Sequence, residues 1–182
     1  MRQIKGSLLK YFIKNIRANK SGIYDEILTE EEKEIINLRI LDSVWYPYEY
    51  FKKLLSAVVK VEANGDMTTV AKWGYDHGKR TLDQIHKGRR EKRPLPLAIA
   101  SYDQLFKLWF DFGKQYGEII SENEINIVIE EFDEDFDLFY YIGSGWIRSF
   151  FENYLDTKIQ LKFLQKSWEG DDKTILNLNW NS

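Results

Sequence analysis

The feature that most constrains this chain is a change in its hydrophobic period near residue 120. Before that point apolar residues recur at helical spacing. In the segment that opens at Ser101 the repeat runs through Leu105, Phe106, Trp109, Phe112 and Tyr116. From residue 124 the stretch "EINIVIEEF" alternates and is rich in β-branched residues, which predicts a strand. The chain is therefore expected to combine a helical part with a sheet.

Five helices are expected in the first 120 residues, separated by short polar loops. Their starts are marked by Ser7, Thr29, Pro47, Asp66 and Ser101. Thr29 is followed three residues later by Glu32, the pattern of a capping box. Pro47 suits a first helical turn, where its missing N–H has no partner in any case.

The tail predicts a strand–helix–strand–strand unit with antiparallel pairing. Residues 138–155 return to helical spacing, and 158–165 and 174–180 alternate around an acidic turn that contains Gly170. We expect Trp180 to be buried against the 138–155 helix, with Asn177 and Asn179 on the opposite face of the strand. The fold class is thus α+β. A single domain is expected over 1–182, with a helical part at 1–120 and a strand–helix–hairpin part at 121–182.

The composition limits the chemistry. The 182 residues include no Cys and two His, which excludes disulfides and thiolate metal sites. Net charge is −3 and no apolar run reaches membrane-spanning length, so neither nucleic acid nor a membrane is an expected partner. No signal-peptide pattern is present, and a cytoplasmic location is expected. Nucleophile-elbow, phosphate-loop and dinucleotide motifs are lacking, and we expect no enzymatic activity.

Several stretches together resemble a known family. These are "GSLLKYF", "VWYPYEYFKKLL" and the tail from "GWIRSFFENYL" to "TILNLNW". They resemble an uncharacterised bacterial family described as abundant in myxobacteria. More distantly, the tail is similar to haem–nitric-oxide-binding and four-vinyl-reductase domains. This resemblance implies helices over an antiparallel sheet, with a small molecule held between the layers.

The same resemblance also bears on cofactors. The haem-binding relatives use a helical His as iron ligand and a Tyr-x-Ser-x-Arg motif for the propionates. Here "YIGSGWIR" at 141–148 has these residue types at a different spacing. We therefore predict no cofactor and do not expect haem.

Five residues are candidates for a ligand pocket because they combine aromatic walls with one imidazole. They are Trp45, Tyr46, Trp73, His77 and Trp109. For each of them, ordinary helix packing is the alternative. Gly143, Ser144 and Gly145 are poor helix formers that would let a neighbouring backbone come close.

Two charged segments have competing interpretations. The basic segment at 86–94, "HKGRREKRP", is either a solvated loop or a site for phosphates or an acidic partner, including a second copy of this chain. The acidic segment at 130–137 starts like a calcium loop, but Leu138 and Ser144 occupy the positions that need Gly and Glu. It is expected to cap the following helix instead.

The expected function is a non-enzymatic sensory or protein-interaction module that binds a small apolar ligand between helices and sheet. A purely structural or partner-binding protein with a filled core is one alternative. A sensor of haem or another cofactor is a second. A protein partner or a homodimer fits each of these, and the sequence does not choose between them.

Overall fold

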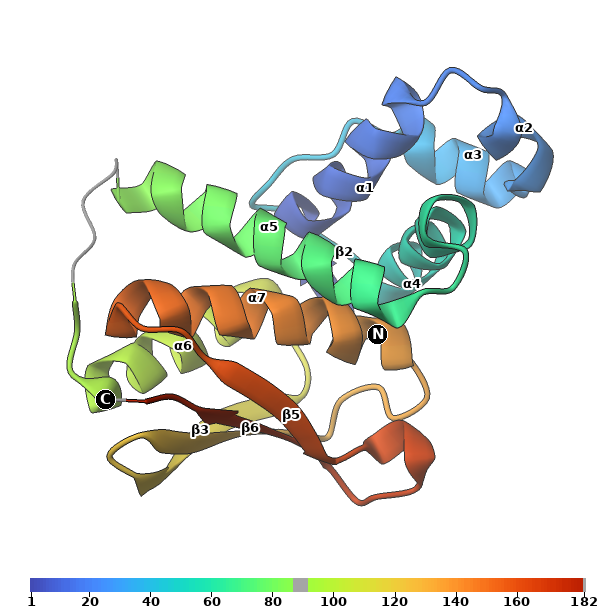
Figure 1. Cartoon of the computed structure of the whole chain (residues 1–182). Coiled ribbons are helices and arrows are strands. Elements are labelled where there is room, and N and C mark those ends of the chain that lie inside the picture. Colours follow the sequence, from blue (N-terminus) through green and yellow to red (C-terminus); the bar gives the residue numbers. More distant parts are fainter. Residues whose placement is uncertain (87–91, 182) are drawn as a thin grey trace. The chain divides into compact units, whose positions relative to one another are not determined.

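The computed structural model describes residues 1–86 and 92–181, and its contacts divide the chain into two compact units. The first unit is Met1–Asp66 with Leu108–Phe112, and the second is Met67–Lys107 with Gly113–Ser182 (Figure 1). The single domain expected over 1–182 stays a prediction.

The first unit is mostly helical. Its elements are β1 (Gln3–Lys5), α1 (Gly6–Ala18), α2 (Ile23–Ile27), α3 (Glu30–Asn37), β2 (Trp45–Pro47) and α4 (Tyr48–Val58), which continues into a π-helical turn at Val59–Ala63. β1 and β2 pair in antiparallel fashion. The capping box of Thr29 and Glu32 is confirmed at the start of α3. The expected Ser7 cap is wrong: α1 begins at Gly6, after Lys5, and has no side-chain cap.

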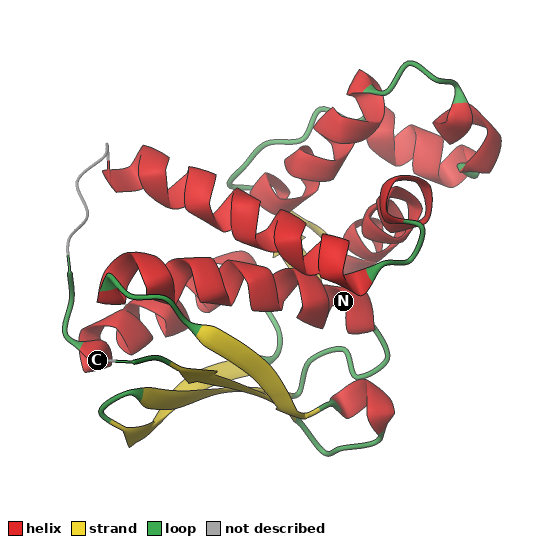
Figure 2. Cartoon of the chain, viewed as in Figure 1, coloured by secondary structure: helices red, strands yellow, loops and turns green. Residues whose placement is uncertain are grey.

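The second unit contains a four-stranded sheet. Its elements are α5 (Met67–His86), α6 (Leu95–Trp109), β3 (Lys114–Ser121), β4 (Glu124–Glu130), α7 (Asp137–Leu155), β5 (Gln160–Gln165), a 3-10 turn (Ser167–Glu169) and β6 (Thr174–Asn179). The strand order is β3-β4-β6-β5, and every neighbouring pair is antiparallel. The last two residues of α6 group with the first unit. The α+β class is confirmed (Figure 2).

One face of this sheet is buried under helices. Ile125 pairs with Leu178 and Ile127 with Leu176, and all four side chains are fully buried. α7 reaches β5 through the rings of Tyr141 and Phe163, whose centroids lie 5.4 Å apart. Alternation along β4 and β6 thus supplies the apolar face that antiparallel sheets pack on a helical layer.

Strand β3 corrects the predicted long helix through Phe112 and Tyr116. α6 ends at Trp109, and Gly113 takes a φ of +78°, which favours glycine. Tyr116 then pairs with Val128 of β4. The aromatic spacing matched a helix, but from Lys114 onward pairing with β4 satisfies the backbone instead.

The structure of the tail follows the prediction except for the burial of Asn177. Gly170 lies in the turn with a φ of +102°, as expected. Trp180 lies one residue beyond β6 and is mostly but not fully buried, and its predicted contact with the 138–155 helix stays a prediction. Asn177 is buried rather than facing solvent. Its amide donates to Glu124 at 2.8 Å and to Asn126 at 2.9 Å, and these cross-strand bonds make the burial tolerable.

Candidate functional site

Helices α5 and α7 approach each other at reciprocal glycines. A Cβ added to Gly145 would lie 1.8 Å from the carbonyl oxygen of Ala71, and one added to Gly74 would lie 1.8 Å from that of Ile142. The expectation that Gly145 admits a neighbouring backbone is confirmed. Gly143 differs, because a Cβ there would meet nothing within 4 Å.

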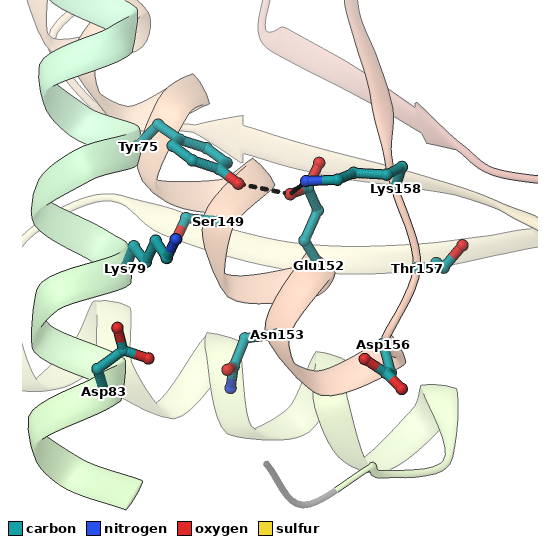
Figure 3. Close-up of a pocket in the computed structure, with 9 residues that line it drawn as sticks. All are labelled: Tyr75, Lys79, Asp83, Ser149, Glu152, Asn153, Asp156, Thr157 and Lys158. Carbon is teal, nitrogen blue, oxygen red and sulfur yellow. Dashed lines mark hydrogen bonds and ion pairs between the residues drawn. The ribbon is translucent and has the colours of Figure 1, made fainter. Parts of the chain in front are cut away.

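A cavity of about 290 Å³ opens between these helices, near the C-terminal end of α7 (Figure 3). Three lining residues come from α5, and the others come from the end of α7 and the segment that follows it. They are Tyr75, Lys79, Asp83, Ser149, Glu152, Asn153, Asp156, Thr157 and Lys158. We call this space the α5–α7 cavity.

Glu152 forms a hydrogen-bonded wall of the α5–α7 cavity. Its Oε2 accepts from the Tyr75 hydroxyl at 2.7 Å and from Lys158 Nζ at 3.3 Å. Its Oε1 accepts from Arg148 Nε at 3.0 Å and from the Ile159 backbone N–H at 3.2 Å. Glu152 is 9% exposed, so these donors replace the water that burial removes.

The network fixes the protonation states of its members. Burial alone raises the pKa of Glu152, but the bonds from Tyr75, Ile159 and Arg148 outweigh it and leave this pKa below its usual value. The hydrogen bond to Glu152, followed by burial, raises the pKa of Tyr75. Glu152 is therefore ionised at neutral pH, and Tyr75 keeps its proton.

Other polar groups of the α5–α7 cavity lack partners among the described residues. The buried amide nitrogen of Asn153 has no hydrogen-bond partner there. Lys79 and Asp83 are exposed and stand four residues apart on α5, and no hydrogen bond or ion pair to another described residue satisfies either. The cavity thus offers an amide donor, a cation and a carboxylate to a bound molecule.

The five predicted pocket residues are divided between the units and do not line this cavity. Trp45, Tyr46 and Trp109 belong to the first unit, and Trp73 and His77 to the second. Lys5 Nζ lies 3.8 Å from the centroid of the Trp45 ring. The Tyr46 hydroxyl accepts from the Leu41 N–H at 3.0 Å. A ligand-binding role for these five residues remains a prediction.

His77 lies on α5 with a half-buried side chain. Burial, and secondarily the positive charge of Arg80, lowers its pKa. The imidazole is therefore neutral near pH 7, which is the form that binds metals.

The structure describes the acidic segment and part of the basic segment. The Asp133 side chain is buried, and its Oδ1 accepts from the Asp135 N–H at 3.3 Å. Within the described ranges, no group of three or more His, Cys, Asp or Glu is arranged to hold a metal. Arg93 Nη1 donates to Ser101 at 3.0 Å and its guanidinium covers the Tyr154 ring, so Arg93 is not simply solvated. Residues 87–91 of the basic segment lie outside the described residues.

A second cavity, of about 430 Å³, lies within the first unit, around Arg17, Tyr24 and Lys33. Several of its polar side chains already have partners: Arg17 donates to the carbonyl oxygens of Ile36 and Leu38, and the Tyr24 hydroxyl donates to Glu62 at 2.8 Å. No helix among the described residues is long and apolar enough to cross a membrane. The α5–α7 cavity is the better candidate for a binding site because the buried amide nitrogen of Asn153 has no partner among the described residues, whereas no such buried atom is found among the residues that line the second cavity.

Sequence reasoning did not single out any residue of the α5–α7 cavity. Its charged members come from α5, α7 and the segment after α7, and they form no motif. The available signal was the small residues of "GSG" together with the two glycines, four positions apart, of "WGYDHG"; they predict a close helix crossing beside which a cavity can open.

No family model and no curated protein sequence matches this chain. Solved structures do match. An H-NOX protein from S. oneidensis in the Fe(II)NO ligation state is 12% identical, with a TM-score of 0.66 over 98% of this chain and 100% of that one. An H-NOX mutant from K. algicida gives a TM-score of 0.56 at 14% identity, over 98% and 97% of the two chains. A trafficking protein particle complex subunit 3 from Naegleria fowleri, covalently bound to palmitic acid, gives 0.54 at 19% identity, over 74% and 95%.

These similarities bear on three expectations. The prediction that this protein does not bind haem is contradicted. The matching structures include an H-NOX protein in the Fe(II)NO state and one solved to probe haem distortion in the H-NOX family. The resemblance to a family abundant in myxobacteria finds no support among these matches. The resemblance to haem–nitric-oxide-binding domains is confirmed at the level of structure: the chain has an H-NOX-like α+β fold.

Proposed function

We propose that this protein is a non-enzymatic sensory module that binds a small molecule and passes the signal to a protein partner. The observation that carries the proposal is the similarity to H-NOX structures over 98% of the chain. Fold alone does not fix function. The proposal therefore needs a ligand to be identified, and haem is the first one to test.

Haem iron needs an axial ligand, and His77 has suitable chemistry. Of the two histidines, His77 is the one whose side chain the structure describes, and burial favours its neutral form. A bound haem would supply an iron that takes up a diatomic gas, the kind of ligand named for the S. oneidensis protein. On this proposal a ring nitrogen of His77 would hold the iron of a bound haem.

Titration of the purified full chain with haemin tests this proposal. We expect a Soret band that saturates at one haem per chain, and a further shift when the reduced protein is exposed to nitric oxide. His77→Ala should abolish the saturable Soret band, whereas His86→Ala, the matched control, should keep it. A featureless spectrum with wild-type protein, or equal loss in both variants, would refute haem sensing through His77.

A second candidate is an acyl chain as the ligand. The trafficking-complex structure with bound palmitic acid favours it, as does the aromatic layer between α7 and the sheet. Mass spectrometry of an organic extract of the purified protein tests this candidate. A fatty acid present at about one per chain would support it, and an extract without acyl species would reject it.

A further inference from the structure

We propose that the α5–α7 cavity binds a small zwitterion of the α-amino-acid class. This site goes beyond the proposed function, since His77, the residue proposed to hold haem iron, does not line this cavity. The first observation is a pair of opposite charges on one helix. Lys79 and Asp83 both line the cavity, and neither is paired with another described residue.

The second observation is the Asn153 amide. Its nitrogen is buried at the cavity wall and has no acceptor among the described residues. A buried donor without a partner is unfavourable, and an acceptor oxygen from a ligand would relieve this cost. A carboxylate supplies such an oxygen. The amide therefore favours a ligand with an acidic or carbonyl group on the α7 side.

The third observation is the charge balance around the cavity. Glu152 is already matched by Arg148 and Lys158, so it is not free to hold a ligand cation. Together with Arg148, the lining sets three cations against three carboxylates, the latter being Asp83, Glu152 and Asp156. A ligand with both charges and no net charge keeps this balance, whereas a simple anion or cation would disturb it.

The arrangement gives the ligand a direction. Figure 3 shows the Lys79 side chain extending from α5 toward Ser149, with Asp83 one turn further along the same helix and Asn153 across from it. The ligand carboxylate is placed between Lys79 and Asn153, and its ammonium group faces Asp83. At about 290 Å³ the space suits a molecule of amino-acid size and is small for a drug-sized one.

Calorimetric titration of the full chain with each of the standard amino acids tests this proposal. We expect at least one of them to bind saturably. Its analogues without the amino group or without the carboxylate should bind about tenfold more weakly or worse, because each loses one charged contact. For L-alanine these analogues are propionate and ethylamine.

Three variants assign the binding to this cavity. Lys79→Met and Asp83→Asn should each weaken binding about tenfold or more. Both residues are exposed, so folding should be kept, and a melting curve checks this. Lys72→Met is the matched control, because Lys72 lies on the same helix, pairs with Asp76 and does not line the cavity.

Four results would overturn the proposal. They are a lack of saturable binding at millimolar amino acid, equal affinity for the single-charge analogues, binding of an anion such as phosphate in place of the zwitterion, and equal losses in Lys72→Met and Lys79→Met. The haemin titration is measured by absorbance on the His77 and His86 variants, whereas amino-acid binding is measured by calorimetry on the variants of α5. Failure of one proposal is therefore distinguishable from failure of the other.

Discussion

The two sides of α7 pack against their neighbours in opposite ways. Toward α5 the helix presents small residues, and at Gly145 the neighbouring backbone comes so close that no Cβ fits. On another side it presents large rings: Phe150 contacts Trp146, Phe151 and Tyr154 on its own helix and Tyr102 on α6. The first side packs closely because its glycines have no side chain, and the other side packs by filling space with large rings. Removing volume should therefore destabilise the aromatic side, and adding volume should destabilise the glycine side.

The largest effect is expected on the aromatic side. Phe150 is fully buried, and Phe150→Ala removes its ring from four aromatic contacts. We expect a loss of about 3–5 kcal/mol in the free energy of unfolding, from lost burial plus the cavity left behind. Urea unfolding measures it. Phe150→Leu, a control that removes the ring but keeps a large apolar side chain, should lose clearly less. Equal losses would show that this side does not depend on ring packing.

On the small-residue side, adding a single methyl group should be destabilising. Gly145→Ala would place a Cβ 1.8 Å from the Ala71 carbonyl oxygen and 2.7 Å from the Tyr75 nitrogen, both of them backbone atoms. Since α5 and α7 must then move apart, we expect a loss of about 3 kcal/mol or more. Thermal unfolding checks this. An unchanged melting temperature would mean that the close helix approach is not present in solution.

Glu152, which joins α7 to Tyr75 of α5, should make the stability of the fold depend on pH. The pKa of Glu152 is lower in the folded protein than its ordinary value of 4.5. Its ionised form therefore stabilises the fold fully above about pH 4.5, and this contribution is lost as the pH falls through the lowered folded-state value. Removing the charge should cost about 1.5–3 kcal/mol at neutral pH, the range for hydrogen bonds to a charged group.

Melting curves of Glu152→Gln over a range of pH isolate this contribution. The variant should be less stable than wild type at pH 7, and the difference should shrink below pH 4.5. Glu169→Gln is the control, since Glu169 is exposed and pairs only with Lys166 on the surface. A constant difference at every pH would exclude Glu152 as the titrating group.

The smallest effect has the opposite sign. Gly143 lies in α7, two residues before Gly145, where a Cβ would meet nothing within 4 Å. Gly143→Ala should raise the free energy of unfolding by about 0.5–1 kcal/mol, because alanine loses less backbone freedom in a helix. Denaturant melts of this variant and of Gly145→Ala form a matched pair. Destabilisation by both would mean that Gly143 also faces a close neighbour.

Elements whose signal is local were predictable from the sequence. The strand predicted at 124–132 is observed as β4, and the helix predicted at 138–155 is observed as α7. The capping box at Thr29 and the turn at Gly170 also agree. For α7, the capping box and the turn, a few neighbouring residues carry both the pattern and the hydrogen bonds that stabilise it. For β4 the alternation is local, although its hydrogen bonds go to β3 and β6.

Tertiary structure decided the rest, because the partners come from distant parts of the chain. Strand β3 exists only because it pairs with β4, although its Tyr116 continues the helical spacing of the preceding segment. The burial of Asn177 depends on acceptors more than 50 residues away. Glu152 meets Tyr75 across 77 positions, and Asn153 lines a cavity only because α5 packs against α7 at Gly145. Sequence periodicity reports that a side chain is buried, whereas the fold decides which groups it is buried against.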